Sequence, residues 1–164
     1  MSERNEPALD PRDLDVGTLA LFVGQAFVDE VRRRVEAKGL SGLRVSHGYV
    51  IQHLVTSPRT ISELATRMGV TQQAASKSVA ELEALGYVER RVAPEDARVR
   101  TVALSARGEE AVRAARAARS ALERELARRH GDDAIRRARR LLADLLTDLG
   151  GVPSVRARRV RPPR

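Results

Sequence analysis

The sequence contains no cysteine, which excludes disulfide bonds, thiolate metal sites and regulation by cysteine oxidation. It has no apolar run approaching the roughly 18 residues that a membrane-spanning helix needs, so we expect a soluble protein with no membrane partner. The first 12 residues are charged and lack an apolar segment, so we expect no secretory signal and a cytoplasmic location. A chain of 164 residues has room for one domain with its own core.

Basic residues outnumber acidic ones, but the surplus is concentrated at one end. The formal net charge is +8, from 30 Lys and Arg against 22 Asp and Glu. Five of the arginines and none of the acids follow Gly150, so residues 1–150 hold 25 basic and 22 acidic residues. Net charge alone is therefore weak evidence for nucleic-acid binding. We predict a flexible N-terminus over 1–12 and a basic disordered tail over 151–164.

Apolar residues recur at helical spacing near both ends of the chain. The pattern predicts helices over 14–37 and 44–55, and a third over 132–149 whose leucines form a continuous stripe. Ser105 is a good N-cap for a long helix that runs to residue 129 and ends before Gly131. A stripe as apolar as that of 132–149 needs a partner surface.

Two short helices follow one another in the middle of the chain. Thr60 and Glu63 have the spacing of a capping box, and Gly69 stands where a left-handed C-cap ends that helix. Thr71 then caps a second helix over 72–85. The three-residue connection is typical of a helix-turn-helix.

After Gly86 the apolar period changes to two, over 87–92 and again over 98–104. This alternation predicts a β-hairpin with its loop at 93–97. The expected fold class is mainly α with a small β-hairpin wing (α+β), a winged helix-turn-helix flanked by further helices.

A helical wheel of 72–85 separates an apolar side from a polar one. The apolar side holds Ala74, Ala75, Ser78, Val79, Leu82 and Leu85, and the outer side holds Gln72, Gln73, Ser76, Lys77 and Ala80. Amides can make bidentate contacts to adenine, and a cation can contact guanine or phosphate. An isolated polar stripe is more often a solvated face, but the neighbouring short helix and hairpin favour DNA binding. We predict DNA contacts from Thr71, Gln72, Gln73, Ser76, Lys77, Arg98 and Arg100.

The wing contains a carboxylate two residues before an arginine. Asp96 can pair with Arg98 and preset the direction in which the guanidinium enters a minor groove. The alternative is an ordinary turn closed by a surface salt bridge, worth at most about 1 kcal/mol.

Several segments together resemble one known family, the MarR family of winged-helix regulators. They are residues 57–65, 68–71, 76–77, 82–90, 94–98 and 102–108, with Asp96-Ala97-Arg98 and Leu104-Ser105-Ala106-Arg107-Gly108 as the most specific parts. At the wing this family often has Asp-Arg-Arg, so Ala97 removes one potential phosphate contact.

The resemblance implies how the chain is organised and what it does. It implies a homodimer held by 13–43 and 105–150, with 44–104 as the DNA-binding unit of a single domain over 13–150. It further implies a repressor that binds double-stranded DNA at a pseudopalindromic operator and releases it when a small aromatic or phenolic effector binds.

Three side chains of the second helix are candidates for lining an effector pocket: His47, Tyr49 and His53. A histidine in this position is more often a partly buried, hydrogen-bonded side chain. A metal site from His47, His53 and His130 is disfavoured, because a six-residue spacing does not place two ligands on one helix face.

We predict no metal, no cofactor and no enzymatic activity, since no nucleophile–base pair or phosphate-binding loop is present. Two other functions stay open at this point. One is a winged-helix protein-interaction module, and the other is a metal-responsive regulator.

Overall fold

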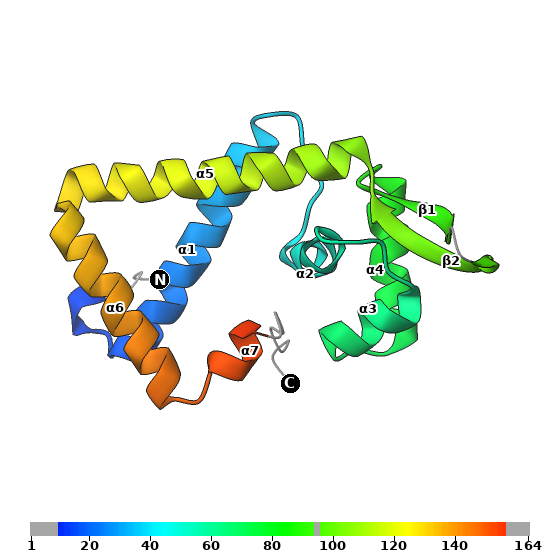
Figure 1. Cartoon of the computed structure of the whole chain (residues 1–164). Helices are drawn as coiled ribbons and strands as arrows, with labels where there is room; N and C mark the ends of the chain where they lie inside the picture. Colours follow the sequence, from blue (N-terminus) through cyan, green and yellow to red (C-terminus); the bar gives the residue numbers. More distant parts are fainter. Residues whose placement is uncertain (1–9, 94–95, 157–164) are drawn as a thin grey trace, which may run out of the picture.

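The computed structural model describes residues 10–93 and 96–156, which form helices and a single two-stranded hairpin (Figure 1). The elements in chain order are a 3₁₀ turn η1 (Pro11–Asp13), α1 (Val16–Glu36), α2 (Val45–Leu54), α3 (Ile61–Met68), α4 (Gln72–Ala84), β1 (Val88–Ala93), β2 (Asp96–Leu104), α5 (Ala106–His130), α6 (Asp132–Asp148) and α7 (Val152–Arg156). The fold is a winged helix-turn-helix with helices before and after it, as the sequence predicts.

Three long helices make up one part of the molecule, which we call the frame: α1, α5 and α6. In Figure 1 α5 runs along the top, α1 crosses behind it, and α6 turns back at the far end of α5. Arg34 of α1 links the first two, because its guanidinium donates to Glu125 of α5 at 2.6 Å and to Glu30 of its own helix at 2.6 Å. No residue of α6 is buried.

The other part, which we call the lobe, comprises α2, α3, α4 and the hairpin, residues 45–104. Its helices pack around a core of large side chains with almost no exposure. The largest of them are Tyr87, Leu64, Leu82, His47, Val50, Val79 and Val102. The largest core side chains therefore lie in the lobe, and the same core continues into the end of α1 and the first half of α5.

The hairpin is antiparallel, with pairs from Val88↔Leu104 to Val92↔Arg100. A shift after Val92 then pairs Ala93 with Asp96, so the strands extend further than the sequence predicted and the five-residue loop shortens to two. Arg59, in the segment before α3, exchanges two backbone hydrogen bonds with Val102, at 3.0 and 2.7 Å. This bridge attaches the start of the helix-turn-helix to the base of the wing.

Both ends of the described chain differ from the sequence prediction. Pro11–Asp13 form a 3₁₀ turn, because the Asp10 carboxylate accepts from the Arg12 N–H at 2.9 Å. Val152–Arg156 form a short helix in place of disorder, since backbone bonds from Gly151 to Leu146 and from Ser154 to Gly151 hold its start. The predicted disorder over 157–164 and flexibility over 1–9 lie outside the described residues. Within the described part, no helix is long and apolar enough to cross a membrane.

Candidate nucleic-acid interface

The helix-turn-helix is built by the caps that the sequence predicts. Thr60 N–H donates to the Glu63 carboxylate at 2.8 Å, and Glu63 N–H donates to the Thr60 hydroxyl at 3.2 Å. The bond from the Thr60 backbone lowers the pKa of Glu63, so the box is intact at neutral pH. Gly69 ends α3 at φ +69°, a left-handed conformation that glycine adopts without strain. The chain can therefore turn within three residues before α4 begins.

The first turns of α4 present the predicted polar residues to solvent. Gln72, Gln73 and Lys77 are exposed, while Ser76 is half-buried. Two of the predicted groups also have local partners, since the Thr71 hydroxyl accepts from the Ala74 N–H at 3.2 Å and the Gln72 amide donates to the Ser62 hydroxyl at 3.3 Å. Gln73 and Lys77 thus offer the most accessible polar groups of this face.

The packed side of α4 is narrower than the helical wheel predicted. Ala75, Val79 and Leu82 are buried, but Ala74 is exposed. Successive residues lie about 100° apart around a helix, so Ala74 falls outside the sector that faces the core. The placement of Ala74 on the apolar side was wrong, and this leaves a small side chain on the outer face of the helix.

The wing continues the exposed surface away from the core. Arg100 and Val102 point to the same face of β2 by the two-residue alternation of a strand, and Arg98 lies in the irregular part of the strand beyond them. Val102 is buried in the lobe, whereas Arg98 and Arg100 lie beyond it and are exposed. The side chain of Asp96 is outside the described residues, so its predicted role in orienting Arg98 stays a prediction.

His47 has a structural partner rather than an open pocket. Its Nδ1 accepts from the Arg44 N–H at 3.2 Å, which places the proton on Nε2, and Nε2 donates to the Glu81 carboxylate at 3.1 Å. The Arg44 guanidinium pairs with the same carboxylate. These two donors hold the pKa of Glu81 below its ordinary value. The group ties the start of α2 to the recognition helix α4, a contact between residues 34 positions apart that sequence reasoning did not find.

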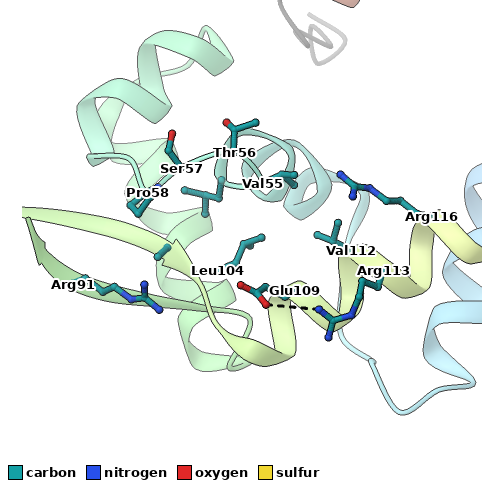
Figure 2. A pocket seen from close by; sticks show the side chains of 12 residues that line it. Val55, Thr56, Ser57, Pro58, Arg91, Leu104, Glu109, Val112, Arg113 and Arg116 are labelled. Carbon is teal, nitrogen blue, oxygen red and sulfur yellow. Dashed lines mark ion pairs between the residues drawn. The ribbon is translucent and has the colours of Figure 1, made fainter.

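A cavity of about 350 Å³ lies between the end of α2, the hairpin and the first turns of α5 (Figure 2). Leu54, Leu104 and Val112 give it apolar walls, and Arg91, Glu109, Arg113 and Arg116 give it charge. Glu109 pairs with Arg113 at 3.7 Å and Arg91 pairs with Glu89 at 2.5 Å. Among the described residues Arg116 has no ion-pair partner, and Figure 2 shows its side chain extending toward the α2 side of the cavity.

The residues predicted to line an effector pocket lie elsewhere. His47 and His53 are buried within the lobe, Tyr49 is half-buried, and none of the three lines this cavity. Their role in binding an effector stays a prediction. Across residues 10–93 and 96–156 no group of three or more His, Cys, Asp or Glu is arranged to hold a metal ion.

A comparison with known protein families finds a match over the segment that contains α4 and the start of β2. Residues 41–99, from the linker before α2 to the middle of β2, match the sequence profile of the MarR family. Over this segment the chain is similar to the MarR family. Among curated protein sequences, none matches the chain significantly.

Solved structures of this MarR-type fold cover most of the chain. Rv1404 from Mycobacterium tuberculosis is 20% identical with a TM-score of 0.69, covering 88% of this chain and 99% of its own. YusO from Bacillus subtilis is 23% identical with a TM-score of 0.64, covering 83% and 94%. The F27L mutant of MepR from Staphylococcus aureus, solved with an oligodeoxyribonucleotide, is 16% identical with a TM-score of 0.61, covering 84% and 99%. These structures share the fold, and the match of residues 41–99 to the MarR family supports a DNA-binding transcription regulator.

Proposed function

We propose that this protein is a ligand-responsive repressor of the MarR family that acts in the cytoplasm and binds a pseudopalindromic operator as a homodimer. The observation that carries the proposal is a pair of surfaces that one chain leaves uncovered. One is the polar face of α4 with the wing arginines, and the other is the apolar face of the frame.

The apolar face of the frame supports the dimer. Large apolar side chains of α1 and α6 are strongly exposed in the single chain: Val16, Leu19, Leu21, Phe22, Val23, Phe27, Val28, Leu141, Leu142, Leu146 and Leu149. Covering apolar surface is favourable by about 25 cal/mol per Å², so a surface with this many exposed large apolar side chains favours association. A second copy offers the same face, which a two-fold interface requires.

A dimer also compensates for the low net charge of the segment from α4 through the wing. Residues 71–104 hold five basic and five acidic residues, so one lobe has little net attraction for phosphate. A dimer doubles the contacts and makes the second binding event intramolecular. Operator half-sites would then lie roughly one DNA turn, about 34 Å, apart.

The cavity beside α5 is the site that we propose for the effector. It has apolar walls, a volume of about 350 Å³ and the guanidinium of Arg116, which suits an aromatic ring with an acidic or phenolic oxygen. It touches α5 of the frame and both strands of the wing, so an occupant can alter the placement of one relative to the other. MepR, which shares the fold, has been solved with ethidium bromide bound.

The operator is tested by selecting bound sequences from random duplex DNA, with the oligomeric state measured by sedimentation. We expect a dimer that enriches an inverted repeat. A stable monomer with no preference among duplexes would overturn the proposal.

The effector site is tested by thermal shift with a panel of phenols and aromatic acids, using Arg116→Ala and the exposed Arg119→Ala as matched variants. We expect a shift in wild type and in Arg119→Ala that Arg116→Ala reduces. A shift by zinc alone that is lost in His47→Ala would instead establish a metal-responsive regulator.

A further inference from the structure

The frame and the lobe are connected by two chain crossings that meet at one place. The first is the linker 37–44, which leads from α1 to α2, and the second is Ser105, between β2 and α5. Both contact the turn at 85–87, which directly follows the recognition helix α4. In Figure 1 this region lies where α5 reaches the base of the hairpin.

The first crossing is held by side chains from the other two segments. The Tyr87 hydroxyl donates to the backbone carbonyl of Ser41 at 2.8 Å. The Arg107 guanidinium donates to the backbone carbonyl of Gly39 at 3.0 Å and lies over the Tyr87 ring, 4.8 Å from its centroid. Leu40, between those two carbonyls, is 2% exposed and anchors the linker in the core.

The second crossing contacts the same turn through its backbone. Ser105 N–H donates to the Tyr87 carbonyl at 3.1 Å, and its hydroxyl donates to the Gly86 carbonyl at 2.6 Å. Gly108 of α5 approaches so closely that a Cβ there would lie 2.0 Å from the Tyr87 carbonyl oxygen. Only glycine allows this approach, so the start of α5 rests directly on the end of the turn.

We infer that this junction, defined as Ser41, Tyr87, Ser105, Arg107 and Gly108, sets the direction of α4 relative to the frame. Tyr87 and Arg107 are thereby positioning residues for the operator spacing that the dimer accepts. The inference rests on the proposed function, because spacing has meaning only for two copies on one duplex.

A small change of angle at the junction is enough to change the spacing. The 13 residues of α4 make a lever of about 20 Å, with the junction at one end and Gln72 at the other. A tilt of roughly 5° moves the Gln72 end by about 1.7 Å, and two copies together move by about 3.5 Å. That displacement is close to the rise between successive base pairs of DNA, about 3.4 Å.

The Tyr87 hydroxyl allows the positioning role of this residue to be tested apart from its packing in the core. The ring is 0% exposed and fills the core, which phenylalanine would do equally well. The hydroxyl instead bonds to a backbone carbonyl 46 positions away, on the linker to the frame. Removing it leaves the core volume intact and loosens the connection between the two parts.

The experiment uses Tyr87→Phe and Arg107→Met, with Arg119→Met on the exposed side of α5 as the matched control. Each is measured on the selected operator and on operators with one base pair added to or removed from the spacer. Because the chain has no cysteine, Ala80→Cys on the exposed side of α4 gives a single site for a spin label in each background. The label reports the distance between the two α4 helices without DNA.

In wild type we expect one spacing to be preferred by about tenfold over its neighbours, which corresponds to ~1.4 kcal/mol. In Tyr87→Phe and Arg107→Met we expect that preference to shrink to about threefold or less and the distance distribution to broaden. The Arg119→Met control should match wild type. Preserved spacing preference and preserved distances in both variants would overturn the inference and leave the proposed function standing. A wild type that forms no dimer, or prefers no spacing, would overturn both.

Discussion

The lobe and the frame bury their apolar residues very differently. Among the described residues, the seven largest fully buried side chains all lie in the lobe, between residues 47 and 102. In the frame, α6 buries nothing, and α1 buries only Val31 and Val35 near its end. The buried residues of α5 are small and lie in its first half, at Gly108, Ala111, Ala114 and Ala118.

This difference distinguishes the side chains that are buried within one chain from the apolar surface that stays available for association. The largest core side chains are buried within one chain, so the contribution of the lobe to stability should not depend on protein concentration. The frame presents apolar side chains of α1 and α6 that stay exposed among the described residues, so its contribution should rise with concentration as copies associate. The proposed DNA-binding surface lies on the lobe, and the apolar surface that would bring two copies together lies on the frame.

The largest effect is expected in the lobe core. Leu82→Ala removes a side chain with 0% exposure and should lower the free energy of unfolding by about 2–5 kcal/mol. Denaturant unfolding at several protein concentrations measures it. The loss should be the same at each concentration, whereas Leu141→Ala in the frame should have an effect that grows with concentration. A concentration-dependent loss in Leu82→Ala would contradict the placement of this part of the core within one chain.

The next effect is expected on association through α6. Leu142 is 50% exposed in the single chain and lies in the apolar stripe, so Leu142→Glu would place a charge inside the proposed interface. The dimer dissociation constant should rise by about 100-fold, or ~2.8 kcal/mol. Sedimentation measures it, with Ala143→Glu, an exposed position about 100° around α6 from Leu142, as control. An unchanged dimer would place the interface elsewhere.

A smaller effect is expected at the wing. Arg98→Ala should weaken operator binding by roughly thirtyfold, or ~2 kcal/mol, because an inserted guanidinium is lost from the groove. The fold and the dimer should be unchanged, since Arg98 is exposed at the far end of the hairpin. Gel-shift titration measures the affinity, with Arg128→Ala on α5 as control. Equal loss in both variants would indicate that charge alone, and not wing insertion, accounts for the effect.

The parts of the lobe with local signals could be predicted from sequence. The Thr60–Glu63 capping box, the Gly69 C-cap and the alternation in the strands each depend on residues within a few positions. They therefore appear in the sequence as short patterns, and the structure confirms them. The stripe on α6 likewise predicts an amphipathic helix without requiring its partner.

Contacts between distant segments could not be predicted in this way. The bond from His47 to Glu81 joins two helices, and the bond from Tyr87 to Ser41 joins the turn after α4 to a linker. Neither pair has a spacing that distinguishes it from other pairs, because only the packed lobe brings the residues together. For the same reason the cavity beside α5 is lined by residues that the helical pattern of α2 gave no cause to choose.

The smallest effect concerns how the frame holds together within one chain. Arg33 and Arg34 donate to Glu30 and lower its pKa from 4.5 to about 2, and Arg34 also reaches Glu125 of α5. Because the folded state depresses this pKa, the ionised carboxylate stabilises the fold above pH 4.5, and the stabilisation is lost as the pH falls from 4.5 to about 2. Glu30→Gln should therefore melt slightly below wild type at neutral pH and at the same temperature near pH 2. Thermal unfolding across this range measures the difference, with Glu36→Gln as control. A difference that is independent of pH would mean that the ionisation of Glu30 does not contribute to the stability of the frame, and that the substitution acts through the packing of α1 alone.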